Sequence, residues 1–191
     1  MSARAHLVSY EPATYDDLES APADYTVELV GGRLHAQPRP RGKHIGIEAT
    51  LGMRLGPPFQ LGDGGPGGWW ILDEPEIHFI QDVEVTVPDL AGWRRERMPS
   101  LPEDHRFLII PDWVCEILSP STRRFDLDEK KPLYARYGVR WLWLLDPDAE
   151  VLEACTLAAG GWHSERTFGP DDPVDADPFR GVQFTVASLC R

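Results

Sequence analysis

The segment WVCEILSPST, residues 113–122, decides the fold class of this chain. Its first six residues predict a strand, and side chains alternate along a strand, so Glu116 shares its face with Val114 and Leu118. A carboxylate in so apolar a strand is costly to bury unless it is paired or bound to a metal ion. The alternative is an edge strand that leaves Glu116 in water.

The residues after this strand predict a helix. Four of them follow at a regular spacing of four, which keeps side chains on one helix face. Pro132 is tolerated only in or near the first helical turn, so we expect a helix over residues 128–137. Lys130 would then lie in the first turn, close to the end of the strand and to Glu116. A solvated surface lysine is the alternative for Lys130, and we expect Tyr134 to be a packing residue. The four spaced residues are Asp126, Lys130, Tyr134 and Gly138.

Strands surround two or three helices in the rest of the chain. Gly31-Gly32 predicts a hairpin turn between strands at 25–30 and 33–37. Apolar residues at helical spacing predict a helix over 43–55, and residues 141–145 are apolar without alternation, as in a central strand. This pattern indicates the α/β or α+β class, with a mixed sheet and helices packed on it. Further strands are expected at 69–72, 76–80, 82–87, 151–157, 162–168 and 181–186, a short helix after Thr14, a loop at 62–68 and irregular chain at 94–106.

Composition is that of a globular protein, because 42% of the 191 residues are hydrophobic and 26% are charged. This length fits a single domain over residues 1–191. The three cysteines are odd in number and far apart, which predicts neither a disulfide framework nor a zinc site. No apolar run approaches the length of a membrane span or a signal peptide. We therefore expect a cytoplasmic protein with no membrane partner.

Charge is unevenly distributed along the chain. The net charge of −12 argues against a general affinity for nucleic acid, since phosphate contacts call for a basic surface. Residues 33–44 nevertheless hold four basic residues, two histidines and no acid, whereas residues 146–177 hold nine acids and one arginine. A solvated face is the ordinary interpretation of such a run.

Asp89 is the natural partner for Glu116. It follows Pro88 at the end of the strand-like segment 82–87. An Asp and a Glu on adjacent strands form an oxygen pair suited to Mg²⁺, which takes one or two carboxylates together with water and substrate phosphate. Two acids 27 residues apart are not specific by themselves.

In combination, these motifs resemble the Uma-two family, a bacterial family described as restriction endonucleases and formerly catalogued as a domain of unknown function. The resemblance extends over residues 14–189. It implies a restriction-endonuclease-like fold, a mixed β-sheet flanked by helices, with a metal site of the PD-(D/E)xK nuclease superfamily. The segments that carry it are 27–34, His44, 87–90, 116–122, the residues spaced by four after Glu116, and 141–147.

The resemblance assigns Asp89 and Glu116 to the two acids of the motif, as catalytic residues and metal ligands. The lysine of the motif should stand two residues after the second acid, where this chain has Leu118. Lys130 is the matching position on the following helix, and Lys131 is the neighbouring fallback.

Two earlier residues also match the family. Glu28 matches a glutamate that can complete the catalytic and metal site, and its strand neighbours give no other reason for an acid. His44 matches the helix histidine of the family, for which a buried structural role and a catalytic role both stand.

The implied function is hydrolysis of DNA phosphodiester bonds with Mg²⁺ or Mn²⁺ as cofactor, and a homodimer is compatible with it. The basic run 33–44 could approach the DNA backbone beside the site. The main alternative is a non-catalytic interaction module that retains the nuclease fold, which the net acidity favours. A metal-dependent hydrolase of a smaller phosphate ester is a further alternative.

Overall fold

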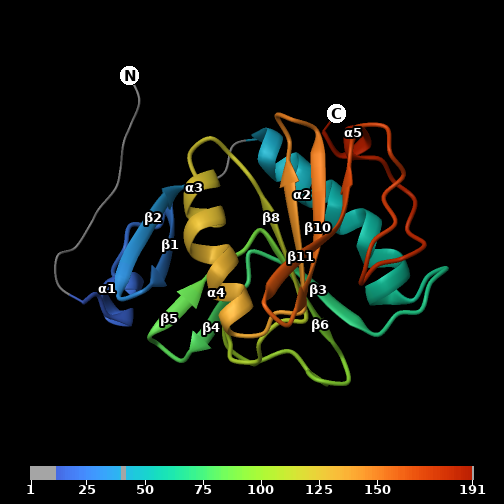
Figure 1. Ribbon diagram of the computed structural model, residues 1–191. Helices are drawn as coiled ribbons and strands as arrows, with labels where there is room; N and C mark the ends of the chain where they lie inside the picture. Colours follow the sequence, from blue (N-terminus) through green and yellow to red (C-terminus); the bar gives the residue numbers. More distant parts are fainter. Residues whose placement is uncertain (1–11, 40–41, 191) are drawn as a thin grey trace.

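The strands form two mixed sheets in the computed structural model, which describes residues 12–39 and 42–190 (Figure 1). The five-stranded sheet has the order β2 (Arg33–Pro38), β1 (Tyr25–Val30), β5 (Glu84–Thr86), β4 (Glu76–Ile80), β7 (Arg106–Phe107). The six-stranded sheet has the order β11 (Gly161–Phe168), β10 (Val151–Ala158), β9 (Trp141–Asp146), β8 (Trp113–Ile117), β6 (Leu90–Arg94), β3 (Trp69–Asp73). Each sheet has one parallel pair, β4 with β7 and β8 with β9. The predicted mixed α and β architecture is confirmed, with the strands divided between two sheets.

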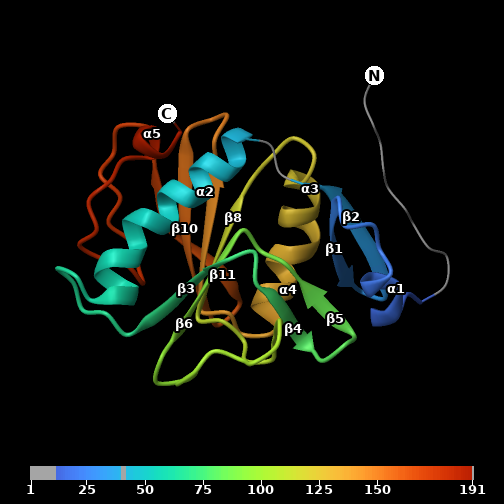
Figure 2. The ribbon, with the colours of Figure 1, turned by 180° about the vertical axis from the view of Figure 1, so that it is seen from behind.

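Helices cover these sheets in separate layers. The short α1 (Tyr15–Glu19) begins at Thr14, whose side chain accepts a hydrogen bond from the backbone of Asp17 in a capping box. Helix α2 (Gly42–Leu55) continues into the π-helical η1 (Gly56–Leu61) and lies across the six-stranded sheet (Figure 2). Between the two sheets lies one helix made of α3 (Arg123–Phe125), the π-helical η2 (Asp126–Lys130) and α4 (Lys131–Arg136), called here the central helix (Figure 1). The last helix is α5 (Val186–Leu189).

Three apolar clusters join these layers. One packs α2 and the C-terminal segment on one face of the six-stranded sheet. A second packs the central helix between the inner faces of both sheets, and a third packs α1 on the outer face of the five-stranded sheet. The central helix is therefore enclosed on two sides, which is why polar residues on it can be buried. Representative members are Leu51 and Trp143 in the first cluster, Leu133 and Leu144 in the second, and Leu18 and Leu29 in the third.

The local turn signals are confirmed. β1 and β2 pair antiparallel with Val30 opposite Arg33, and the two glycines between them have φ values of 59° and 72°. Such positive φ values are costly for residues that carry a Cβ, so Gly31-Gly32 permits the tight hairpin. The predicted helix at 43–55 and the central strand at 141–145 are also present.

The central helix begins at Arg123, five residues before the expected start at residue 128. Pro132 therefore does not lie in its first turn. The preceding segment η2 is π-helical, and the backbone N–H of Lys131 donates to the carbonyl of Asp126, five residues back. π-helical hydrogen bonding of this kind is found mostly as single turns within α-helices. The proline therefore follows a π-helical turn within a longer helix.

Strand β6 is not among the strands expected from the sequence, and Gly92 lies within it. The glycine is required by packing: a Cβ on Gly92 would lie 3.2 Å from a ring carbon of Trp113 and 3.4 Å from one of Trp69. A glycine inside a strand commonly marks such a close approach. The strand expected at 181–186 is wrong, since only Thr185 there makes a β-bridge, to Pro173.

Within residues 12–39 and 42–190, no helix is long and apolar enough to cross a membrane.

Candidate active site

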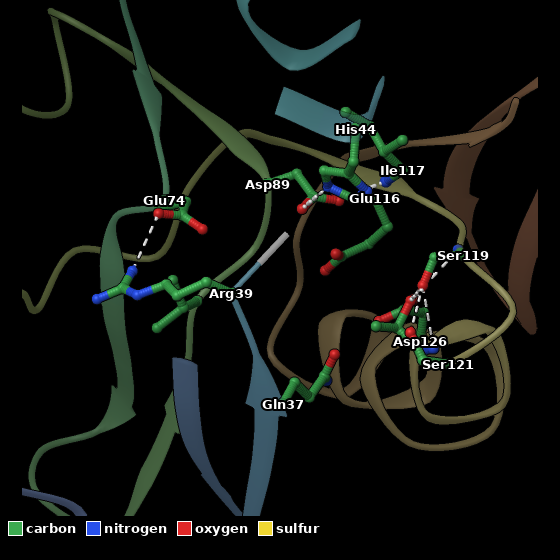
Figure 3. Close-up of polar contacts among 12 residues, drawn as sticks. Gln37, Arg39, His44, Glu74, Asp89, Glu116, Ile117, Ser119, Ser121 and Asp126 are labelled. Atoms are coloured by element: carbon green, nitrogen blue, oxygen red, sulfur yellow. Dashed lines mark hydrogen bonds and ion pairs between the residues drawn. The ribbon is translucent and has the colours of Figure 1, made fainter. Parts of the chain in front are cut away.

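Asp89 and Glu116 lie at the junction of two neighbouring strands. Asp89 directly precedes β6, and β6 pairs antiparallel with β8 so that Leu90 faces Cys115. Asp89 Oδ2 accepts a hydrogen bond of 2.5 Å from the backbone N–H of Ile117, and Asp89 Oδ1 lies 2.7 Å from His44 Nε2 (Figure 3). The strand pairing and the helix α2 thus hold one carboxylate from two sides.

Glu116 is buried in a central strand, since β8 lies between β9 and β6 and the residue is 2% exposed. The hydroxyl of Tyr134 donates a hydrogen bond of 2.5 Å to Glu116 Oε1, and Lys130 Nζ lies 2.8 Å from the same oxygen. Figure 3 shows the Glu116 carboxylate extending below the pair formed by Asp89 and His44. The edge-strand alternative for Glu116 is therefore excluded.

Lys130 points inward from the central helix and is 2% exposed. Besides Glu116, its ammonium lies 3.1 Å from Glu28 Oε1 and 3.7 Å from Asp126 Oδ1. The neighbouring Lys131 is directed elsewhere, with its Nζ 3.9 Å from Glu153 on β10. Of the two lysines considered from the sequence, the structure places Lys130 at the carboxylate cluster.

Glu28 reaches the same cluster from β1. Its Oε1 accepts a hydrogen bond of 2.8 Å from the backbone N–H of Val87, and Gln37 donates to Oε2 at 3.4 Å. Lys130 therefore stands between Glu28 and Glu116, and Glu28 anchors the lysine in this arrangement. A direct contact of Glu28 with a metal ion stays a prediction.

Three carboxyl groups surround the Lys130 ammonium in this cluster. Burial raises the pKa values of the Glu28, Glu116 and Asp126 carboxyls, and the single Lys130 ammonium offsets this only in part. Burial alone would lower the pKa of Lys130, but the carboxylates of Glu116 and Glu28 outweigh it and hold that pKa well above its usual value. The surroundings thus stabilise the protonated lysine and disfavour ionisation of all three carboxyls at once.

Three residues of the site were not assigned to it from the sequence. Tyr134 packs in the core as expected and also donates to Glu116. Asp126 was noted only as the first of the residues spaced by four. Glu48 was missed, although it follows His44 by one helical turn on the buried face of α2. Burial, and then the charge of Asp89, raise the pKa of Glu48 to about 8. An acid on an apolar helix face is the signal that could have found it.

Asp89 also raises the pKa of a neighbouring residue, His44. Burial would lower the pKa of His44, but the hydrogen bond and charge of Asp89 outweigh burial and raise it. The protonated imidazole is thereby favoured, and the His44 side chain is partly exposed, at 15%.

The carboxylate oxygens of Asp89 and Glu116 are donors that fit a hard divalent cation. No three His, Cys, Asp or Glu side chains in the described part of the chain are arranged to hold a metal ion together. Asp89 and Glu116 are two carboxylates on paired strands, and Mg²⁺ commonly takes one or two carboxylates while water and substrate complete its shell. The pair therefore fits an ion that depends on its substrate for part of its coordination.

The basic run predicted at 33–44 is only partly described, because residues 40 and 41 lie outside the described residues. Arg39 pairs with Glu74 at 3.5 Å, and Lys43 lies 3.8 Å from Asp148 (Figure 3 shows the first pair). Both ion pairs are exposed, so they contribute little to stability.

Known proteins share both the sequence pattern and the fold. Residues 12–187 match the model of the Uma2 family, described as "Putative restriction endonuclease". The chain is also similar to a crystal structure described as a "putative nuclease belonging to DUF820" from Anabaena variabilis, with 24% sequence identity and a TM-score of 0.75. This similarity covers 93% of the chain and 97% of the other protein and shows a common fold. No curated protein matches the chain. The chain belongs to the Uma2 family, the Uma-two family that its motifs resemble.

Proposed function

We propose that this protein is a metal-dependent endonuclease that hydrolyses phosphodiester bonds in DNA. One observation carries the proposal: Lys130 Nζ lies 2.8 Å from Glu116 on a strand paired with the one that Asp89 precedes. Two carboxylates and a lysine at the junction of two strands are the elements of a PD-(D/E)xK site. Membership of a family described as restriction endonucleases supports the same reaction class.

Asp89 and Glu116 are the residues that would hold the ion. When bound, Mg²⁺ or Mn²⁺ supplies Lewis-acid stabilisation of the charge on the phosphate oxygens. Lys130 and Tyr134 both contact Glu116 Oε1, so they fix the orientation of this carboxylate. His44 and the backbone of Ile117 fix that of Asp89 in the same way. This support keeps the carboxylates in place before the substrate arrives.

Lys130 acts in this proposal as a cation. Three carboxylates lie within 3.7 Å of its ammonium, so the group stays protonated and does not accept a proton from water. It stabilises negative charge that develops on the phosphate during attack. Glu28 and Asp126 hold the lysine beside Glu116, which replaces the lysine that other sites of this type carry at the position of Leu118.

A non-catalytic interaction module is the second candidate, and the net charge of −12 favours it. A large negative charge repels a DNA backbone over most of a protein surface. The site itself argues for catalysis, because buried like charges destabilise a fold that does not use them.

Cleavage of DNA by the purified protein separates the two candidates. Supercoiled plasmid and labelled single-stranded and duplex oligonucleotides are incubated with Mg²⁺, with Mn²⁺, or with a chelator. The nuclease proposal predicts cleavage that requires the divalent ion. Absence of cleavage from every substrate under both ions contradicts it and supports the interaction module.

A further inference from the structure

A groove of about 490 Å³ lies between the edge strand β2 and the beginning of the central helix. Strand β2 contributes the side chains that share a face with Glu28, because His35 stands opposite Glu28 in the antiparallel pair. The volume is within the range of pockets that bind small molecules. Its lining includes Arg33, His35, Gln37, Arg124, Phe125 and Asp128, and we call it the β2 groove.

The β2 groove adjoins the candidate active site through Gln37. Gln37 lines the groove and donates to Glu28 Oε2 at 3.4 Å, while Glu28 Oε1 contacts Lys130. Ser121 also lines the groove, and its hydroxyl lies 2.9 Å from that of Ser119 in the loop that follows β8. Figure 3 shows Gln37 and Ser121 both below the Glu116 carboxylate, the side towards which that carboxylate extends. A chain of nucleotides with its phosphate at Glu116 would therefore place a neighbouring nucleotide at the groove.

The groove offers an aromatic surface. The rings of His35 and Phe125 are stacked, with centroids 4.1 Å apart and an interplanar angle of 21°. Both residues are half-buried, so part of their surface remains open to the groove. Nucleobases of single strands stack on aromatic side chains of this kind.

Cations and polar groups accompany this aromatic surface. Arg124 has a side chain that is 95% exposed and pairs only weakly with Asp128 at 3.4 Å. No ion pair joins Arg33 to another described residue of the chain. A guanidinium binds a phosphate through two parallel hydrogen bonds. Gln37 and Asp128 supply amide and carboxylate groups that can meet the edge of a base.

We infer that the β2 groove binds one unstacked nucleotide of single-stranded DNA, next to the phosphodiester bond at the candidate active site. This inference rests on the proposed function and names its substrate class. A recess between a strand and a helix admits a single base, whereas a duplex keeps its bases stacked inside. The acidic protein also needs fewer phosphate contacts for a short single strand than for a duplex lying across its surface.

Fluorescence anisotropy of the full chain tests the inference. The probes are a fluorescein-labelled oligothymidylate of about ten nucleotides, matching the site size of single-strand binders, and a duplex of the same length. Both carry phosphorothioate linkages, which resist hydrolysis, and Mg²⁺ is present. Phe125→Leu keeps an apolar side chain but removes the stacking surface, and Arg124→Glu reverses an exposed charge. Arg54→Glu, an exposed arginine on α2 outside the groove, is the matched control.

Wild-type protein should bind the single strand more tightly than the duplex. Phe125→Leu should weaken single-strand binding about tenfold, Arg124→Glu should weaken it several-fold, and Arg54→Glu should have a much smaller effect. Binding by both groove variants equal to that of the wild type, tighter binding of the duplex, or no binding of the single strand would overturn the inference.

Failure of the inference can be told from failure of the proposed function. Metal-dependent cleavage that is unchanged in Phe125→Leu and Arg124→Glu supports the nuclease proposal and contradicts nucleotide binding in the β2 groove. Single-strand binding that depends on Phe125 and Arg124, without any cleavage, supports nucleotide binding in the β2 groove and contradicts the nuclease proposal.

Discussion

Lys130 Nζ and Glu116 Oε1 are 2.8 Å apart, and this buried ion pair joins the central helix to the middle of the six-stranded sheet. The position two residues after Glu116 is Leu118, which is 7% exposed and packs in the cluster around the central helix. A lysine from the helix thus reaches the carboxylate that a lysine on the strand reaches in the PD-(D/E)xK motif. The geometry requires the helix to lie directly on this face of the sheet.

Replacing Lys130 by methionine should destabilise the protein strongly. The change leaves Glu28, Glu116 and Asp126 buried without their shared cation, and removing one partner of a buried ion pair costs about 3–5 kcal/mol. Urea unfolding of the wild type and the variant gives the difference. Lys131→Met is the matched control and should cost less than about 1 kcal/mol, as its ion pair with Glu153 is partly exposed. Equal small losses for both lysines would show that Lys130 does not hold the carboxylates.

Glu116→Gln should leave the free energy of unfolding unchanged or raise it in metal-free buffer. Burial, together with the charges of Asp126, Asp89 and Glu28, raises the pKa of Glu116, whereas an amide of the same shape carries no charge to bury. Lys130 keeps two other carboxylates in this variant. A loss of about 3–5 kcal/mol would instead show that the fold depends on the charge of Glu116 in its ion pair with Lys130.

Gly92→Ala should destabilise the fold by about 1–3 kcal/mol, the usual cost of overpacking a core. The new methyl group would press on the rings of Trp113 and Trp69 at 3.2 Å and 3.4 Å. Gly46→Ala in α2 is the control, since no atom lies within 4 Å of a Cβ there and alanine favours a helix by about 1 kcal/mol. Thermal unfolding should show a lower midpoint for the first variant and a higher midpoint for the second; a lower midpoint for both would contradict the packing argument.

Glu48→Gln should stabilise the metal-free protein by an amount that increases with pH. The folded-state pKa of Glu48 is about 8, above its ordinary value of 4.5, so the folded protein binds a proton that the unfolded chain has released. The stability that this proton contributes is present at low pH and is lost as pH rises toward about 8. Glutamine has no such dependence, so the difference should grow across this window and then level off. The groups that act on Glu48 are Asp89, Glu74, His44 and Asp73.

Melting temperatures of the wild type and Glu48→Gln, measured at several pH values with a chelator, check this prediction. A difference that stays constant with pH would mean that Glu48 titrates as an ordinary surface acid.

Most of the fold that could be predicted depends on residues that are close together in the sequence. The hairpin at Gly31-Gly32 and the buried strand around Glu116 depend on residues close in sequence, and both could be predicted. The helix start at residue 128, inferred from Pro132, was wrong, because the proline follows a π-helical turn within a longer helix. Strand β6 was missed, and the close packing at Gly92 within it depends on Trp113 and Trp69, which are distant in sequence.

The same difference between local and long-range effects applies to the candidate site. The approach of Lys130 to Glu116 followed from a helix that comes directly after the strand. Glu48 could not be placed, because its position beside Asp89 depends on how α2 packs against the six-stranded sheet. The burial of Lys130 likewise depends on a second sheet, which the sequence did not separate from the first.

The rate of DNA cleavage in Mn²⁺ by wild-type protein, Asp89→Asn, Glu116→Gln and the control Glu153→Gln tests the central claim most directly. Glu153 is a carboxylate on β10 that pairs with Lys131 outside the site. The account predicts cleavage by the wild type and by Glu153→Gln, and none by the other two variants, with all four proteins folded. Cleavage by Asp89→Asn and Glu116→Gln at the wild-type rate, or no cleavage by the folded wild type, would contradict it.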